Sequence, residues 1–132
     1  MIPGIIVSHG KLAEELKVAV ELIVGPSRKL HAISNEGFEP DSLAESIRKH
    51  FPENQPVFIF TDLRGGSCWR AAMIAAKAHD NIRVFAGVNM PMLISFITKR
   101  SQLPVAELLE VILEDTSRGI MLEKLPERKP GK

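Results

Sequence analysis

Pro56-Val57-Phe58-Ile59-Phe60-Thr61 is the stretch of sequence that decides the fold. It is apolar up to Thr61, which is typical of a strand whose two faces are both covered, as in a parallel sheet between two layers of helices. A second short apolar run, Gly4-Ile5-Ile6-Val7, has the same character. We therefore predict two central buried strands, each followed by a loop.

The segments around these two runs predict an alternation of strands and helices. Further strands are predicted at residues 30–33 and 82–86, the first with less β-branched character. Helices are predicted at residues 11–24, from 40 or 41 to 51, from 67 to about 79, from 91 to about 100, and from 105 to near 119. The apolar face of the first helix is expected to carry Leu12, Leu16, Ala19, Val20 and Ile23. This order predicts an α/β fold, an open, doubly wound, mainly parallel, flavodoxin-like sheet with helices on both faces. Residues 120–125 are predicted to form a short C-terminal edge strand.

Composition narrows the class of protein. Lys and Arg total 17 against 16 Asp and Glu, and the net charge of +1 provides no general basic field, so no nucleic-acid partner is expected. The single cysteine, Cys68, cannot form an internal disulfide and is interpreted as a packed apolar residue in a reduced, cytoplasmic protein. No apolar run approaches the roughly 20 residues of a membrane span. We expect one domain over residues 1–125 and a polar, disordered tail over residues 126–132.

Two loops, Ser8-His9-Gly10 and residues 61–67 (TDLRGGS), follow the two buried strands. Loops after parallel strands gather at the carboxyl edge of a sheet, so His9 and Asp62 can become neighbours there. An imidazole can attack a phosphoryl group when its other nitrogen is held by a partner, and a carboxylate suits that role. Gly65-Gly66-Ser67 offers backbone donors and a hydroxyl at a helix start, where Ser67 is also expected to cap the helix. The residues alone therefore predict an anion-binding histidine site.

Three blocks of sequence resemble the signature blocks of a known family. They are residues 4–10 with Leu12-Ala13, residues 60–63 with Gly65-Gly66-Ser67, and residues 87–93 (GVNMPML). In this order and at these separations they look like the mannose-family EIIA domain of the bacterial phosphoenolpyruvate-dependent sugar phosphotransferase system (PTS). The resemblance runs from residue 4 to about residue 125.

The resemblance implies that the chain carries a phosphoryl group and needs no cofactor. Nε2 of His9 would accept phosphate from the phosphocarrier protein HPr and pass it to an EIIB partner, while Asp62 holds Nδ1. The phosphate-binding residues would be Gly10, Gly65, Gly66 and Ser67, and the wall of the site would include Asn89 and Met90. Family members are commonly homodimers, in which the strand at residues 120–125 can be exchanged between protomers. Contact with the membrane would be indirect, through the transporter.

The sequence departs from the family pattern after Asp62. The family usually has an aromatic or aliphatic residue, a proline and an asparagine where this chain has Arg64, Cys68 and Arg70. Because arginine binds phosphate in a bidentate way, Arg64 or Arg70 is predicted to contact a phosphoryl group or an acidic partner. The alternative for both is an exposed, solubilising arginine. Because of this departure, the sequence does not identify the protein that accepts the phosphoryl group from His9.

Two alternative functions remain. The altered segment from Arg64 to Arg70 also fits a regulatory EIIA-like module whose phosphorylation state controls binding, without sugar transport. A metal chelatase or metal-dependent hydrolase would use His9 and Asp62 as ligands. Such a site usually needs a further His, Cys or carboxylate, and none is evident near these two residues. We therefore expect no resident metal.

Overall fold

Strands and helices alternate along the chain in the computed structural model, which describes residues 1–128. The strands are β1 (Gly4–Ser8), β2 (Leu30–Ser34), β3 (Val57–Thr61) and β4 (Ile82–Ala86). The helices are α1 (Leu12–Val24), α2 (Pro40–Arg48), α3 (Ser67–Ala76), α4 (Met90–Lys99) and α5 (Val105–Arg118). The strands are all parallel, in the order β2-β1-β3-β4. The predicted parallel α/β sheet is confirmed.

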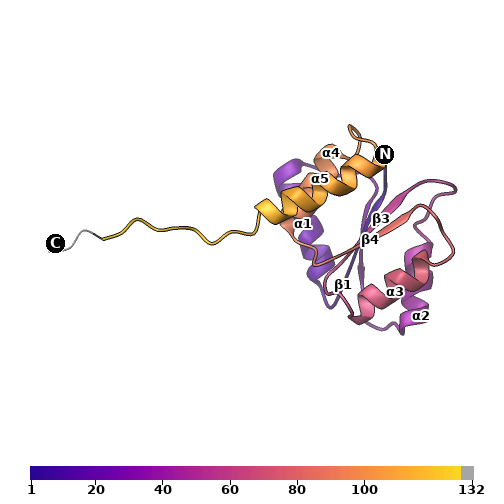
Figure 1. Cartoon of the computed structure of the whole chain (residues 1–132). Coiled ribbons are helices and arrows are strands. Elements are labelled where there is room, and N and C mark those ends of the chain that lie inside the picture. Colours follow the sequence, from indigo (N-terminus) through magenta and orange to yellow (C-terminus); the bar gives the residue numbers. More distant parts are fainter. Residues whose placement is uncertain (129–132) are drawn as a thin grey trace.

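Side chains of the central strands alternate between the two faces of the sheet. In β3, Val57 and Ile59 pack on one face with residues of α2 and α3. Phe58 and Phe60 pack on the other face with residues of α1, α4 and α5. Figure 1 shows the two helical layers on opposite sides of the sheet. Because both faces of β3 are covered, the strand is apolar throughout, as the sequence predicted.

The strand register places the candidate loops side by side. Val7 of β1 lies opposite Thr61 of β3, so the residues that follow these two strands leave the sheet at the same edge. Ser8 lies opposite Ser34 of β2, which brings the loop after β2 to the same place. The carboxyl edge of the sheet therefore gathers three loops from distant parts of the sequence.

Some helix predictions were wrong in detail. In α1, Leu12 and Ile23 were expected on the buried face but are 46% and 64% exposed. Successive helical residues point roughly 100° apart, and α1 turns the small Ala13 toward the sheet, so Leu12 points outward. The ends predicted at residue 51 and about residue 79 are also too late, since α2 ends at Arg48 and α3 at Ala76.

The predicted edge strand at residues 120–125 is also wrong. Residues 120–128 form no helix or strand and extend away from α5, as Figure 1 shows. A strand needs a neighbouring strand to hydrogen-bond its backbone N–H and C=O groups, and this segment points away from the sheet. Its apolar side chains are between 70% and 95% exposed, namely Ile120, Met121, Leu122 and Leu125. Of the tail predicted at residues 126–132, residues 129–132 lie outside the described part.

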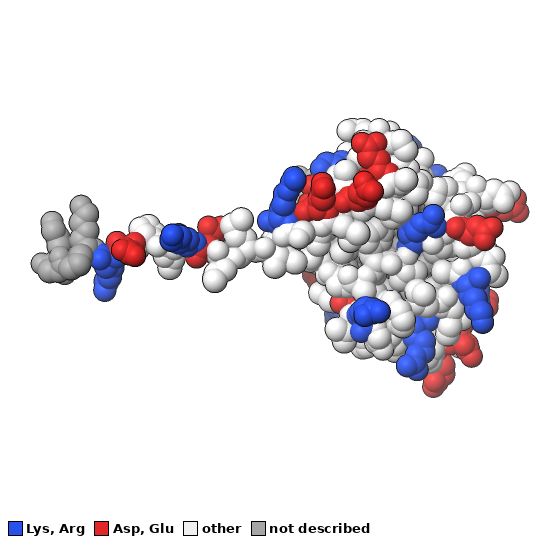
Figure 2. Space-filling model, viewed as in Figure 1, with Lys and Arg blue, Asp and Glu red and all other residues white. Residues whose placement is uncertain are grey.

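Charged side chains of both signs share the surface. Figure 2 shows Lys and Arg interspersed with Asp and Glu on one face, with acidic side chains gathered over α5. The face in this view therefore presents no continuous basic surface. Within residues 1–128, no helix has the length and apolar character needed to cross a lipid bilayer.

Candidate functional site

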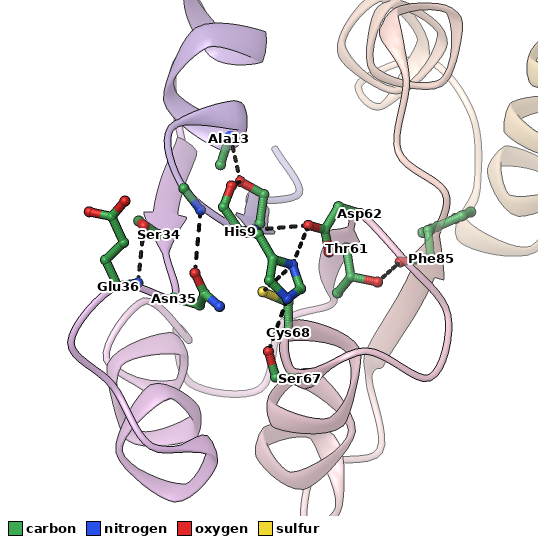
Figure 3. Close-up of polar contacts among 12 residues, drawn as sticks. His9, Ala13, Ser34, Asn35, Glu36, Thr61, Asp62, Ser67, Cys68 and Phe85 are labelled. Carbon is green, nitrogen blue, oxygen red and sulfur yellow. Dashed lines mark hydrogen bonds and ion pairs between the residues drawn. The ribbon is translucent and has the colours of Figure 1, made fainter.

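Asp62, which follows β3, orients His9, which follows β1 (Figure 3). Nδ1 of His9 lies 2.7 Å from Oδ2 of Asp62, and the backbone N–H of His9 donates to the same oxygen at 2.8 Å. The side chain of His9 is 51% exposed, while that of Asp62 is only 11% exposed. The structure thus brings the two predicted residues together, with the carboxylate beneath a solvent-facing imidazole.

The Asp62 carboxyl group is ionised at neutral pH. Burial raises its pKa, but the hydrogen bonds from the backbone and ring of His9 outweigh this effect, and the net pKa lies below the usual 3.8. Of the two tautomers of the imidazole, a carboxylate at Nδ1 favours the one that carries its proton on Nδ1. The lone pair then lies on Nε2, which is the nitrogen suited to attack.

Ser67 lies on the opposite side of the ring from Asp62 (Figure 3). Its Oγ is 3.3 Å from Nε2 of His9. Ser67 was expected to cap α3, but the N-cap residue is Gly66 and no side-chain capping hydrogen bond is present at this end. The hydroxyl faces the imidazole instead. Nε2 therefore lies beside a hydroxyl and the N-terminus of α3, where backbone N–H groups favour anions.

Gly65 and Gly66 shape the turn before α3. Gly65 has φ = 83°, in the left-handed region that favours glycine. A Cβ on Gly66 would lie 3.2 Å from the carbonyl oxygen of Leu63 and 3.6 Å from Cε1 of His9. The turn therefore passes within van der Waals contact of the ring, and a side chain at residue 66 would be tight against the Leu63 carbonyl.

Asn35 holds the loop that carries His9, and the sequence analysis missed it. The backbone N–H of Gly10, expected to bind phosphate, donates to Oδ1 of Asn35 at 3.3 Å. The backbone N–H of Asn35 donates to the carbonyl oxygen of Ser8 at 3.0 Å, and Oγ of Ser8 accepts from the N–H of Ala13 at 2.6 Å. These bonds join the loops after β1 and β2 to the first turn of α1. They depend on strand register, so no local motif signals them.

Cys68 is a second site residue that the sequence analysis missed. It is fully buried, as a packed residue, but its Sγ lies 3.8 Å from Nδ1 of His9. Burial and the charge of Asp62 raise the pKa of the thiol to about 11, so it is protonated at neutral pH. The expectation that no further metal ligand lies near His9 and Asp62 is therefore wrong. The first turn of α3 brings Ser67 and Cys68 to the same ring.

The remaining predicted residues do not share polar contacts with His9 in the described part of the chain. Arg64 and Arg70 are exposed. Asn89 caps α4, because its Oδ1 accepts from the backbone N–H of Met92 at 3.0 Å. Met90 begins α4 and packs against the core on the α1 face. A phosphate or partner contact for Arg64, Arg70, Asn89 and Met90 stays a prediction.

The chain is similar to proteins of the sugar phosphotransferase system. Residues 4–113 match the family model EIIA-man, described as PTS system fructose IIA component. The chain is 30% identical over 115 residues to the PTS system fructose-specific EIIA component of Bacillus subtilis (strain 168), which covers 83% of this chain and 77% of that protein. It is 27% identical over 121 residues to the PTS system mannose-specific EIIAB component of Escherichia coli (strain K12). This match covers 86% of this chain but only 36% of the length of that protein.

A solved structure shares the fold. The phosphotransferase system component EIIA from Streptococcus agalactiae matches with a TM-score of 0.86 at 23% identity, over 92% of this chain and 96% of that chain. The family match covers most of the chain and includes the loops that carry His9 and Asp62. The resemblance seen in the three sequence blocks is thereby confirmed. The chain belongs to the EIIA-man family of PTS IIA components.

Proposed function

We propose that the chain is a phosphohistidine carrier, in which Nε2 of His9 accepts a phosphoryl group from HPr and passes it to an EIIB partner. The observation that carries this proposal is the 2.7 Å contact between Nδ1 of His9 and Oδ2 of Asp62 beneath an exposed imidazole. The contact leaves the lone pair on Nε2, and the exposure lets a protein donor approach it. Membership of the EIIA-man family supports a phosphotransferase activity.

Each transfer forms one bond to phosphorus and breaks another. The lone pair of Nε2 attacks the phosphorus atom, while the bond between phosphorus and the donor atom breaks and its electron pair stays with the donor. Nδ1 of His9 keeps its proton and donates a hydrogen bond to Oδ2 of Asp62. The carboxylate therefore stabilises the positive charge that the ring gains during transfer. The second transfer runs in the same way, with His9 as donor.

The groups around Nε2 suit the oxygens of a phosphoryl group. The hydroxyl of Ser67 lies 3.3 Å from Nε2 and can donate to a phosphoryl oxygen. α3 begins at the same residue and has no acidic side chain in its first turn, so the positive end of its dipole is not neutralised within the helix. Both features favour negative charge next to Nε2.

The proposed partners are HPr as donor, EIIB as acceptor and a second copy of the chain. The Escherichia coli relative is named an EIIAB component, and this chain spans 36% of its length, which supports EIIB as a neighbour in the transfer. A homodimer would cover the exposed apolar side chains of residues 120–125. We expect this segment to pair with an edge strand of the second copy, since residues 120–128 meet no strand of their own chain.

A labelling experiment tests the phosphoryl acceptor. The chain is mixed with phosphoenolpyruvate, Enzyme I and HPr, and the labelled site is mapped by mass spectrometry. We expect one acid-labile, base-stable phosphate on His9, and none in His9→Ala. His31→Ala serves as the matched control, because His31 stacks on His50, outside the site. Labelling of His9→Ala equal to that of wild type would overturn the proposal.

A discharge experiment tests the downstream step and separates transport from the regulatory alternative. Phosphorylated chain is isolated and mixed with candidate EIIB proteins encoded near its gene. A transport component is expected to lose its phosphate to one of them. Stable phosphate with every EIIB, together with capture of an unrelated protein by one phosphorylation state alone, would favour the regulatory function.

A further inference from the structure

A nitrogen, an oxygen and a sulfur that can each bind a metal ion lie close together at His9. His9, Asp62 and Cys68 each offer one ligand atom, and these atoms lie within 4.8 Å of one another. They come from the loop after β1, the loop after β3 and the first turn of α3. Figure 3 shows the sulfur of Cys68 next to the ring of His9. The phosphoryl transfer described above makes no use of this sulfur.

The donor set suits Zn²⁺, and one of its three atom pairs already has the spacing of a tetrahedral site. Zinc binds thiolate, imidazole and carboxylate at about 2.0 to 2.3 Å, so ligand atoms around a tetrahedral ion lie about 3 to 4 Å apart. Sγ of Cys68 is 3.8 Å from Nδ1 of His9, within that range. Oδ2 of Asp62 is 2.7 Å from Nδ1, at hydrogen-bond distance, and would move slightly apart as an ion replaced the proton.

One oxygen of Asp62 is open to a cation. Oδ2 takes both hydrogen bonds from His9, whereas Oδ1 is buried and has no hydrogen-bond partner among residues 1–128. A buried carboxylate oxygen without a partner is unfavourable. A cation held by the carboxylate would remove that cost, and the neighbouring thiol selects a metal that binds sulfur.

We propose that His9, Asp62 and Cys68 together bind one Zn²⁺ per chain in the unphosphorylated protein, and that the bound ion blocks phosphorylation of His9. The ion accepts electron pairs from Nδ1, a carboxylate oxygen and Sγ. The protons of Nδ1 and of the thiol pass to solvent, and no group is oxidised or reduced. Cys68 is buried beside the ring, so the exposed side chain of His9 must turn aside as the ion enters.

The blocking effect rests on the proposed function, whereas the binding does not. Zinc on Nδ1 would replace the proton that Asp62 accepts and would draw electron density from the ring. Nε2 would then be a weaker nucleophile, held in a different orientation. Zinc and phosphate would therefore exclude each other at the same histidine.

Binding is tested with the metal alone. Wild type is titrated with Zn²⁺ by calorimetry and with Co²⁺ by absorption spectroscopy. We expect one equivalent and a thiolate-to-cobalt charge-transfer band. Cys68→Ala is expected to lose the band and to bind Zn²⁺ about 10-fold or more weakly. Cys68→Ser provides a second variant of similar size, and circular dichroism confirms that each is folded.

His50→Ala is the matched control for adventitious binding, because His50 stacks on His31 with ring centroids 4.1 Å apart, in a different cluster. It is expected to bind the metal as wild type does. The absence of a charge-transfer band in wild type, or equal Zn²⁺ affinity of wild type and Cys68→Ala, would overturn the site.

Inhibition is measured as the ratio of HPr-dependent labelling rates with and without Zn²⁺ for the same protein. We expect a reduction of about 10-fold or more in wild type and little change of this ratio in Cys68→Ala, which also controls for effects of zinc on Enzyme I and HPr. Equal ratios would overturn the blocking effect. If wild type binds zinc through sulfur but takes no label even with a chelator present, the proposed function fails while the metal site stands.

Discussion

The buried Arg100 and the largely buried Asp62 are charged residues at opposite edges of the same sheet. Asp62 follows β3 at the carboxyl edge and contacts His9. Arg100 follows α4, and its guanidinium group donates to the carbonyl oxygens of Ile2, at 3.0 Å, and Arg28, just before β1 and β2 begin. Each leaves one buried polar atom without a partner in residues 1–128, Oδ1 of Asp62 and Nε of Arg100.

The partners of the two charges differ. Arg100 binds main-chain carbonyl groups and lies over the ring of Phe96 at 5.2 Å, so it connects the starts of two strands to the core. Asp62 accepts hydrogen bonds from the backbone N–H and from the ring of a single residue, His9, whose side chain is half exposed. A buried charge that binds backbone stabilises the fold, whereas one that orients an exposed side chain supports chemistry.

The largest effect is expected from Asp62→Asn. An amide oxygen in place of Oδ2 can still accept from the two N–H groups of His9, but it holds them less strongly than a carboxylate and carries no charge to stabilise the ring during transfer. We expect transfer from phosphorylated HPr to slow by roughly 100-fold or more, with cooperative unfolding retained. Rapid-quench measurement of single-turnover transfer checks this. A rate equal to that of wild type would remove the orienting role of Asp62.

Arg100→Met is expected to show the opposite pattern. Loss of the guanidinium group leaves the carbonyl groups of Ile2 and Arg28 without this donor, so the free energy of unfolding should fall by about 1 to 3 kcal/mol. Transfer from HPr should be unchanged at temperatures where the variant is folded. Urea denaturation and the transfer assay measure the two properties. An Arg100→Met variant of normal stability that no longer accepts phosphate would contradict the assignment of Arg100 to folding and of Asp62 to phosphoryl transfer.

A smaller effect is expected from Ser67→Ala. This change removes one hydroxyl donor near Nε2 and leaves the Asp62 contact intact, so transfer should slow by roughly 3- to 10-fold. Ser67→Thr keeps a hydroxyl and serves as the conservative control, with a rate between those of wild type and Ser67→Ala. Equal rates for wild type and Ser67→Ala would show that the hydroxyl is not used in transfer.

The smallest effect concerns stability in acid. The pKa of Asp62 is lower in the folded protein than its usual 3.8, so its ionised form favours folding. This contribution is present above pH 3.8 and is lost as the pH falls through the lower pKa of the folded state. The difference in free energy of unfolding between wild type and Asp62→Asn should therefore change in that acid range.

Arg100→Met serves as the comparison for this pH dependence of stability. Burial lowers its pKa, but the guanidinium group stays charged throughout the acid range. The difference between wild type and Arg100→Met should therefore stay constant while that for Asp62→Asn changes. Urea denaturation across the acid range measures both. Parallel curves for the two variants would contradict this assignment.

The sheet and its two central loops were predictable because their signals are local. The apolar runs of β1 and β3 predict strands covered on both faces, and His9 and Asp62 follow these strands directly in the sequence. The outward position of Leu12 in α1 was not predictable in this way, because it depends on how α1 is rotated against the sheet. The edge strand failed for a related reason, since a strand needs a partner that residues 120–125 do not meet in one chain.

The sequence by itself determined the order of strands and helices, the family and the histidine at the centre of the site. Only the tertiary structure decided what surrounds that histidine. Asn35 reaches its loop through the register of β1 and β2, and the first turn of α3 turns the Ser67 hydroxyl and the Cys68 sulfur toward the ring. Hydrophobic patterning follows the chain locally, whereas distances between side chains depend on register and helix rotation, which packing across the whole domain sets.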